Sequence, residues 1–367
     1  MYYLGLMSGT SMDAVDTALV DFSETGLQLI AYEQHDIPAT LQQQIREFQS
    51  SASVSLTTEL DVILGELYAD VINGFLASLD ISPSSVAAIG CHGQTVLHLP
   101  ADNHPRTLQI GDANIIAHRT TITTVADFRR MDIAAGGEGA PLAPAFHAWY
   151  FGTADQKCIL NIGGMANLSV LGQGTTLGFD CGPGNALLDD WIRSNQGESF
   201  DRDGEWALSG KTSMALLNAM LSYDYFDKPP PKSTGKDEFN LDWLKMMCNR
   251  AGESLSPEDV QATLMRLSSA TIADAVNKHA GACKEVIVCG GGYHNLALMG
   301  QLQEALPNIP VLGSEKHGID PDAMEAVAFA WLARQRMERR AGNLPAVTGA
   351  SEAVILGAVY QARPTHE

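Results

Sequence analysis

The chain has 367 residues, and its 43 acidic against 23 basic residues give a formal net charge of −20 at pH 7. This acidic balance disfavours nucleic acid and anionic lipid as partners, because both attract proteins through neutralising cations. The first residues, MYYLGLMSGT, lack the basic region and long apolar run of a signal peptide, and no apolar run approaches the length of a spanning helix. We therefore expect a cytoplasmic protein that binds neither nucleic acid nor membranes.

The length also exceeds that of one ordinary core, so it suits two domains, and small ligands commonly bind in the cleft between domains. The six cysteines show no C-x-x-C spacing, and several lie in apolar runs beside glycine: they are Cys91, Cys158, Cys181, Cys248, Cys283 and Cys289. We expect buried reduced thiols here, in preference to disulfides or a zinc site.

The first glycine turn follows an apolar strand at residues 4–10 (LGLMSGT), and the near-alternating run 14–22 (AVDTALVDF) favours a returning strand. This turn is then a hairpin tip, where Ser8, Gly9, Thr10 and Ser11 offer amides and hydroxyls to a phosphate. Asp13 adds a carboxylate, which suits a phosphate site if a magnesium ion lies between the two charges. The alternative is that Asp13 caps a turn.

Two further glycine turns occur later in the chain. Residues 158–162 lead through Gly163 and Gly164 into residues 166–171, a second hairpin whose likeness to the first suggests two related halves, or a chance repeat of a common turn. Residues 285–289 lead into a triple glycine at 290–292, and Asn295 then caps a helix that ends before Pro307. Three such turns suggest one nucleotide held from several sides, and hence an ATP-dependent enzyme.

The remaining pattern is that of an α/β protein. Residues near 55–80 and 241–280 have helical periodicity, and residues 86–91 form a strand. The proline-rich stretch 225–240 (YFDKPPPKSTGKDEFN) predicts an irregular loop, either a spacer or a lid or wall of the site. The late run 353–360 fits a strand or a helix.

Asp180 is the candidate general base. It ends an apolar stretch and precedes a Gly-Pro-Gly turn and a helix that opens near Asn185. A carboxylate at a strand tip is well placed to take a proton from an attacking hydroxyl group or water. The alternative is ordinary turn capping, since Asp before Gly-Pro is common in turns.

Glu325 is a candidate substrate contact. We expect its helix to be capped at Asp320 and to end near Arg339, before Gly342. Glu325 is the only charged residue between Asp322 and Arg334. An isolated carboxylate on an apolar helix is costly unless paired, although a Glu early in a helix also favours the helix dipole.

Polar side chains near two further strand ends are candidate sugar ligands. They are His92, Gln94 and His98 in GCHGQTVLH, and Asp127, Arg129 and Arg130 in ADFRRMD. Sugar hydroxyl groups need donors and acceptors in fixed positions, but the same residues would also be ordinary as satisfied structural groups.

Seven motifs in order resemble the anhydro-N-acetylmuramic acid kinases, a family in the superfamily of sugar kinases, heat-shock chaperone ATPases and actin. They are GLMSGTSMDAVD (5–16), HGQT (92–95), ADFRRMDIAAGGEGAPLAP (from 126), NIGGMAN (161–167), FDCGPGNALLD (from 179), PPPKSTGKDEFN (from 229) and CGGGYHN (289–295). The resemblance spans nearly the whole chain. One mild departure is Ala14, where a glycine is common, and an ordinary negative φ would tolerate its methyl group.

The resemblance implies two similar actin-like (ribonuclease H-like) lobes with a nucleotide cleft between them. The N-terminal lobe would comprise residues 1–125, with a C-terminal segment at about 345–367 crossing back, and the C-terminal lobe residues 126–344. Homodimers are a family trait. The implied nucleotide contacts are Gly9, Thr10, Ser11, Met12, Asp13, Ala14, Val15 and Asp16, then Asn161, Gly163, Gly164 and Asn167, then Gly290, Gly291 and Gly292. The catalytic residue would be Asp180, and the sugar contacts Ser8, His92, Gln94, Asp127, Arg129 and Glu325.

The implied reaction uses ATP and Mg²⁺, with Asp13 near the metal through water. Water opens the anhydro bridge of 1,6-anhydro-N-acetylmuramic acid while O6 takes the γ-phosphoryl group, which gives N-acetylmuramic acid 6-phosphate in peptidoglycan recycling. Asp180 would deprotonate the water. Two alternatives stay open: an ordinary sugar kinase without ring opening, and a nucleotide-gated binding module.

Overall fold

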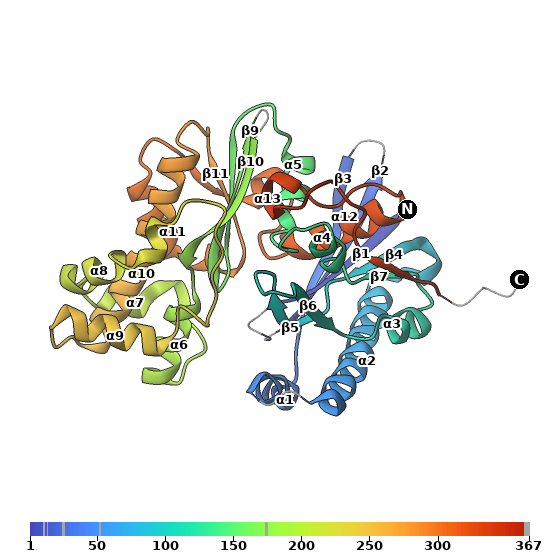
Figure 1. The fold of residues 1–367 in the computed structure, drawn as a ribbon, viewed down its shortest axis with the longest axis horizontal. Helices are drawn as coiled ribbons and strands as arrows, with labels where there is room; N and C mark the ends of the chain where they lie inside the picture. The colour runs from blue at the N-terminus through green and yellow to red at the C-terminus, as the bar shows by residue number, and fades with distance from the viewer. Residues whose placement is uncertain (10–11, 13, 24–25, 51–52, 173–174, 363–367) are drawn as a thin grey trace, which may run out of the picture. The chain divides into compact units, whose positions relative to one another are not determined.

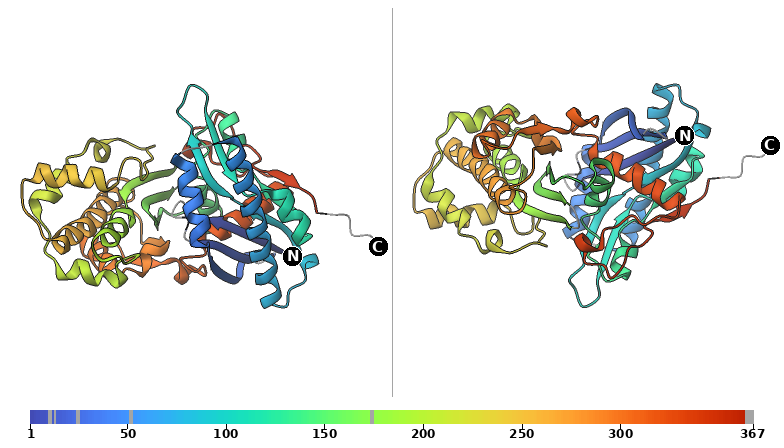
Figure 2. Two further views of the ribbon diagram at one scale, coloured as in Figure 1. Left: turned by 90° about the horizontal axis from the view of Figure 1, so that it is seen from below. Right: turned by 90° about the horizontal axis from the view of Figure 1, so that it is seen from above.

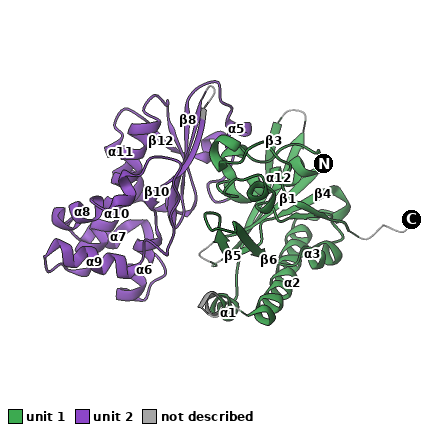
Figure 3. Ribbon diagram, in the orientation of Figure 1, with its two compact units in different colours: residues 1–146, 323–367 green, residues 147–322 purple. Residues whose placement is uncertain are grey.

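The computed structural model describes residues 1–9, 12, 14–23, 26–50, 53–172 and 175–362 (Figure 1). The chain divides into two compact units (Figure 3). Unit 1 comprises Met1–Phe146 and Ala323–Glu367, and unit 2 comprises His147–Asp322. Among the described helices, none combines the length and the apolarity needed to cross a membrane. All six cysteines are free thiols, and five of them are buried.

Unit 1 contains a six-stranded sheet in the order β13-β7-β4-β1-β2-β3. Strands β1, β2 and β3 are antiparallel neighbours, whereas β4 and β7 continue the sheet in parallel with β1. The strands are β1 (Tyr2–Ser8), β2 (Ala14–Ser23), β3 (Gly26–Asp36), β4 (Val86–Cys91), β7 (Thr124–Ala126) and β13 (Ala358–Tyr360), with a separate hairpin of β5 (Gln94–Leu99) and β6 (Arg106–Ile110). The helices are α1 (Ala39–Ser50), α2 (Val54–Ser78), α3 (Ala113–Thr120), α4 (Arg130–Ala134), α12 (Met324–Met337) and α13 (Pro345–Thr348), with the 3₁₀ turn η1 (Pro83–Ser85).

Unit 2 contains a five-stranded sheet in the order β10-β9-β8-β11-β12, with three antiparallel strands followed by two parallel ones. This repeats the order β3-β2-β1-β4-β7 of unit 1, so the predicted related halves are confirmed. The strands are β8 (Lys157–Ile162), β9 (Met165–Gly172), β10 (Thr175–Pro183), β11 (Val286–Cys289) and β12 (Val311–Gly313). The helices are α6 (Ala186–Gln196), α7 (Glu205–Ser209), α8 (Met214–Leu221), α9 (Leu241–Ala251), α10 (Pro257–His279) and α11 (Leu296–Ala305), with 3₁₀ turns η2 (Arg202–Gly204), η3 (Asp224–Asp227), η4 (Gly291–His294) and η5 (Ser314–His317); α5 (Ala143–Phe151) contributes residues to both units.

Alternation along β1 explains the layers of unit 1. Leu4 and Leu6 are buried in one cluster with α2, whereas Gly5 lies on the opposite face of the strand and meets α12. A Cβ atom on Gly5 would lie 1.7 Å from the carbonyl oxygen of Ala326, and one on Gly90 of β4 would lie 2.0 Å from that of Phe329. The backbone of α12 therefore packs directly against β1 and β4. Figure 2 gives two further views of the fold.

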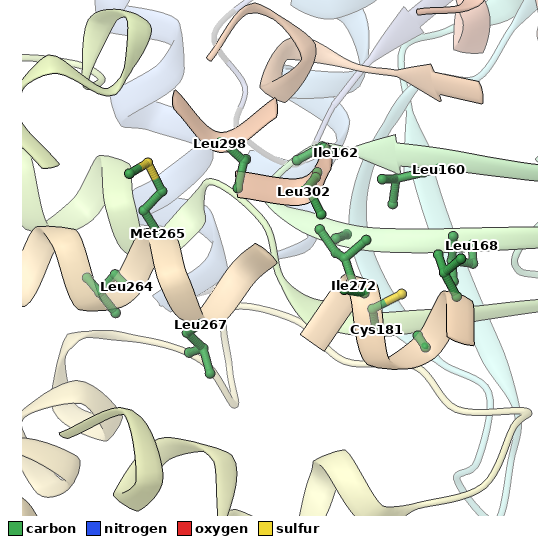
Figure 4. Packing of buried hydrophobic residues seen from close by; sticks show 14 of the residues in the cluster. Leu160, Ile162, Leu168, Cys181, Leu264, Met265, Leu267, Ile272, Leu298 and Leu302 are labelled. Carbon is green, nitrogen blue, oxygen red and sulfur yellow. The ribbon is translucent and has the colours of Figure 1, made fainter. Parts of the chain in front are cut away.

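The core of unit 2 forms between its sheet and the long helix α10 (Figure 4). Leu160 of β8 and Leu168 of β9 belong to one buried cluster with Leu264 and Ile272 of α10. Ser256 caps α10 by accepting a hydrogen bond from the N–H of Asp259 at 3.3 Å. The sheet that carries the second and third glycine turns is thus covered by a buried apolar core.

The units differ from the expected lobes in two stretches, because residues 126–146 and 323–344 belong to unit 1 and not to the later lobe. The cause is packing that is distant in sequence: α12 covers β1 and β4. The C-terminal segment does cross back to unit 1 as expected, since Ala358–Tyr360 pairs with β7.

Two predicted helices also differ in their limits. The helix expected from Asp320 begins at Met324, because the Asp320 carboxylate accepts the N–H of Asp322 at 2.9 Å and forms a turn before the helix. The stretch 241–280 is two helices, α9 and α10, separated at Gly252, whose φ of 69° ends the first. The three glycine-turn segments have the predicted form, two hairpins and one strand leading to a helix capped by Asn295.

We predict that Gly5→Ala destabilises the protein by about 3 kcal/mol or more, because the added methyl group forces α12 away from the sheet. Thermal or denaturant unfolding measures this change. The matched control is Gly74→Ala in α2, where an added Cβ meets nothing within 4 Å. This control should leave stability unchanged or raise it slightly, since alanine is the better helix former. Equal effects of the two substitutions would contradict the close packing of α12.

Candidate functional site

Three predicted site residues form one polar row in unit 2. Asn161 of β8 lies opposite Asn167 of β9, and Asn167 lies opposite Asp180 of β10. Residues directly opposite in antiparallel strands have their side chains on the same face of the sheet. The register therefore brings two amide side chains and a carboxylate together, although they come from separate motifs.

The proline-rich loop 225–240 closes around Asp180. The Oδ2 atom of Asp180 accepts a hydrogen bond from the N–H of Thr234 at 2.9 Å, and the N–H of Asp180 donates to the carbonyl oxygen of Lys232 at 3.0 Å. The Tyr225 hydroxyl group donates to the carbonyl oxygen of Asp180 at 2.9 Å. Of the two interpretations of this loop, the structure favours a wall beside Asp180 over a spacer.

The surroundings of Asp180 make it a stronger base than an ordinary carboxylate. Burial raises the pKa of Asp180 to about 6, while the amide of Thr234 and the charge of Lys232 act in the opposite direction. A carboxyl group with this pKa is ionised at neutral pH and still accepts protons readily. Asp180 is thus suited to general base catalysis.

Lys232 and Thr234 were not among the residues predicted from the sequence. The Lys232 ammonium group donates to the carbonyl oxygens of Tyr225 at 3.2 Å and Phe226 at 3.3 Å, and the Thr234 hydroxyl group donates to Glu238 at 2.7 Å. These contacts hold the loop in place. The only sequence signal was the motif PPPKSTGK itself, which does not show that the loop folds onto Asp180.

The glycines of unit 2 fall into two groups. A Cβ atom on Gly163 or Gly164 would have its nearest contact at 3.6 Å, and one on Gly291 would meet nothing within 4 Å. At Gly290, by contrast, a Cβ would lie 2.2 Å from Oδ1 of Asn161, and at Gly292 one would lie 2.3 Å from the side chain of Ile162. The first group leaves room for a ligand to approach the backbone, whereas the second allows the turn to pack against β8.

The first phosphate loop is only partly described. Thr10, Ser11 and Asp13 lie outside the described residues. The N–H of Met12 donates to the carbonyl oxygen of Gly9 at 3.2 Å, and Met12 has a φ of 59°.

The returning strand of this hairpin begins at Ala14, so its methyl group lies in ordinary strand backbone. Val15 follows and is fully buried. The Asp16 carboxylate accepts hydrogen bonds from the Tyr32 hydroxyl group at 2.6 Å and from the Gln34 amide at 3.1 Å. These bonds fix Asp16 in the hairpin.

Ser8 ends the first strand of this hairpin, and Gln94 contacts the turn that follows it. The Ser8 hydroxyl group is buried and lies 2.9 Å from the hydroxyl group of Tyr68. The amide nitrogen of Gln94 donates to the carbonyl oxygen of Gly9 at 3.3 Å. The Oε1 atom of Gln94 is buried without a hydrogen-bond partner in the described part of the chain, so its acceptor capacity is unsatisfied there.

Buried His92 and half-buried Arg129 form a polar pair in unit 1. The Arg129 guanidinium group donates to Nε2 of His92, from Nη2 at 2.9 Å and from Nε at 3.2 Å, and Nη1 donates to the carbonyl oxygen of Gly139 at 2.8 Å. Burial, followed by the charge of Arg129, holds the pKa of His92 well below its usual value. Burial lowers the pKa of Arg129 to about 10, against the opposite influence of Glu325 and Asp132. His92 is therefore neutral, with its proton on Nδ1.

Glu325 lies in the first turn of α12, within electrostatic reach of Arg129. The surrounding protein raises the pKa of the Glu325 carboxyl group, as does Asp16, whereas Arg129 lowers it. The side chain still reaches solvent. The structure thus brings His92, Arg129 and Glu325 together from three separate segments of unit 1.

The other polar candidates of unit 1 are held by local contacts. Nδ1 of His98 lies 3.1 Å from the Thr107 hydroxyl group, and burial lowers the pKa of His98 to about 4. Asp127 has a φ of 58° and forms an ion pair with Arg130 at 3.5 Å.

Among the described residues, no group of three or more His, Cys, Asp or Glu side chains could hold a metal ion.

Comparison with known proteins identifies the family. The family description "Anhydro-N-acetylmuramic acid kinase" matches residues 1–362. The protein of that name from Pasteurella multocida (strain Pm70) is 48% identical over 365 residues, which cover 98% of this chain and 97% of the relative. The one from Saccharophagus degradans is 46% identical over 365 residues, with 98% of each chain covered.

Solved structures add a weaker likeness. The activator of 2-hydroxyisocaproyl-CoA dehydratase from Clostridium difficile, with bound ADPNP, matches with a TM-score of 0.47 and 12% identity, over 92% of this chain and 96% of that one. A likeness this low carries no functional argument. On the family match and the two relatives, this chain belongs to the anhydro-N-acetylmuramic acid kinase family, and it is a phosphotransferase that uses ATP.

Proposed function

We propose that this kinase couples two events on 1,6-anhydro-N-acetylmuramic acid. Water forms a bond to C1 as the bond from C1 to O6 breaks, and O6 accepts the γ-phosphoryl group of ATP, which gives N-acetylmuramic acid 6-phosphate. Family membership supports the substrate and the phosphoryl transfer. The ring opening is our inference. The observation that carries the proposal as a whole is Asp180, a half-buried carboxylate with a pKa of about 6.

Asp180 would take the proton of the attacking water. Its Oδ2 atom is held by the N–H of Thr234, which leaves Oδ1 as the more available acceptor. Positioning of a base in this way removes much of the entropic cost of bringing water, base and sugar together. The pKa of about 6 keeps the carboxylate charged at neutral pH without making it a poor base.

The nucleotide would lie against the open glycines of unit 2. Gly163, Gly164 and Gly291 leave their backbone accessible, and Asn161 and Asn167 add polar side chains in the same row as Asp180. When bound, ATP supplies the phosphoryl group, and magnesium offsets its charge. Asp13, which lies outside the described residues, stays the proposed metal contact through water.

The sugar would be held by the polar side chains of unit 1. Arg129 supplies hydrogen-bond donors. Nδ1 of His92 and Oε1 of Gln94 are buried polar atoms without a hydrogen-bond partner among the described residues, as expected of groups that a bound sugar would satisfy. Glu325 offers an exposed carboxylate that can accept hydrogen bonds from sugar hydroxyl groups. Ser8 and Asp127 remain proposed contacts; Ser8 in its present rotamer is bonded to Tyr68.

Two further proposals rest on the family resemblance: a cytoplasmic location and a homodimer. Light scattering measures the mass of the purified protein in solution and so tests the homodimer. A monomeric mass at all concentrations would contradict the homodimer.

The ring opening predicts where solvent oxygen appears. Reaction in H₂¹⁸O should place one ¹⁸O atom at C1 of the product and none in the ester oxygen at C6, because O6 is retained from the substrate. Mass spectrometry of fragmented product measures both positions. A phosphorylated product that keeps its anhydro bridge and contains no label would identify an ordinary sugar kinase instead.

Asp180→Asn should lower kcat on the order of a thousandfold, because it removes the positioned base. Nucleotide affinity, measured by calorimetry, should change little. The melting temperature at pH 8 should not fall. The pKa of Asp180 is higher in the folded than in the unfolded protein, so above about pH 4 the ionised carboxylate lowers the stability of the folded state. Asparagine removes this charge and its cost. Activity near that of the parent would remove Asp180 from its proposed role.

The pH profile should show the titration of Asp180. Because the base must be ionised, kcat/KM should rise with pH through an apparent pKa near 6 and then level. Lys232→Met should shift the rising part of this pH profile, its acidic limb, to higher pH, since the charge of Lys232 lowers the pKa of Asp180. Lys228→Met is the matched control, because Lys228 lies over the ring of Tyr225 but does not influence Asp180. An unmoved limb in both variants would contradict the assignment.

A further inference from the structure

A fully buried carboxylate, Asp132 of α4, lies one helical turn beyond Arg129. Its Oδ1 atom accepts hydrogen bonds from the Asn343 amide and the Thr348 hydroxyl group, both at 2.7 Å. Its Oδ2 atom accepts the N–H of Gly139 at 2.8 Å. Three neutral donors thus satisfy the buried oxygen atoms of this side chain, and two of them come from residues more than 200 positions away.

Gly139 connects Asp132 to the proposed sugar site. Its N–H is held by Asp132, and its carbonyl oxygen accepts a hydrogen bond from Nη1 of Arg129 at 2.8 Å. The other side of the same guanidinium group donates to His92. Gly139 has a φ of 71°, a conformation that few other residues adopt readily. The orientation of Arg129 therefore depends on where Asp132 places Gly139.

The C-terminal segment holds the same loop through its backbone. The carbonyl oxygen of Thr348 accepts the N–H of Glu138 at 2.8 Å, and the N–H of Ser351 donates to the carbonyl oxygen of Ala135 at 2.8 Å. Thr348 thus bonds to Asp132 of α4 with its side chain and to the loop that follows α4 with its backbone. Removal of its hydroxyl group leaves the backbone bond available, which makes it a mild way to loosen the loop.

We propose that Asp132 and Thr348 are positioning residues for sugar binding: by fixing Gly139 they hold the Arg129 guanidinium group in the orientation that the sugar requires. Neither residue touches the substrate in this account. The inference rests on the proposed role of Arg129 as a sugar contact. Its consequence is a specific loss of sugar affinity when the network is loosened, because small misplacements of a binding group have large effects.

The test compares two buried threonines of unit 1. Thr348→Val removes a donor to Asp132, and Thr120→Val removes bonds to the backbone of Ile116 and Ile122. Both variants should melt at lower temperature. Only Thr348→Val should raise the KM for the sugar, by about tenfold, with the KM for ATP unchanged. Thr348→Ser, which keeps the hydroxyl group, should restore the parent value.

Asn343→Ala gives a second measurement if Thr348→Val does not fold, since Asn343 donates to the same Oδ1 atom. Equal KM values for the sugar in the Thr348→Val and Thr120→Val variants would overturn the inference and leave Asp132 as a structural tie. Arg129→Lys separates the sugar-binding role of Arg129 from the positioning role of Asp132 and Thr348. If the KM for the sugar is unchanged in Arg129→Lys, the role of Arg129 itself is refuted. If the KM is raised in Arg129→Lys but not in Thr348→Val, only the positioning inference is refuted.

Discussion

The close contact between α12 and the sheet of unit 1 is the constraint on which the rest of that unit depends. Glycines in β1 and β4 let the helix backbone reach the strands, and a single methyl group at Gly5 would occupy the space of the Ala326 carbonyl oxygen. A helix packed this tightly is apolar over most of its surface, since its buried residues run from Met324 to Ala333 with one exception. That exception is Glu325, so the helix that is otherwise buried along this stretch presents one carboxylate within electrostatic reach of Arg129.

In unit 2, opposing interactions set the pKa of Asp180. Its sheet places the carboxylate in a row with two asparagines, and the loop 225–240 then partly covers it. Burial alone would leave the charged form too costly, whereas the amide of Thr234 and the charge of Lys232 recover part of that cost. The result is a base that is charged at neutral pH but only moderately stabilised. Such intermediate stabilisation is what proton transfer requires.

The sequence predicted the parts of this structure that depend on local patterns. Alternation and glycine gave both hairpins, and the N-cap Asn295 gave the start of α11. The limits of the units were wrong, because residues 126–146 are held in unit 1 by contacts such as that between Asp132 and Thr348, which no local pattern contains. The contact of the proline-rich loop with Asp180 was left open for the same reason. Asp180 itself was found as a strand-end carboxylate, but its pKa depends on the tertiary environment.

The discontinuity of unit 1 has a consequence for the order in which the protein is completed during synthesis. Unit 2 is one continuous stretch, so all of its residues have been made by position 322. The first strand of the unit 1 sheet is β1, near the start of the chain. The helix that covers one face of this sheet, α12, ends only at Met337, and the edge strand of the sheet, β13, ends only at Tyr360. On a ribosome, the first strands emerge with their glycine-lined face still open to solvent, and the unit that starts first is the one that finishes last.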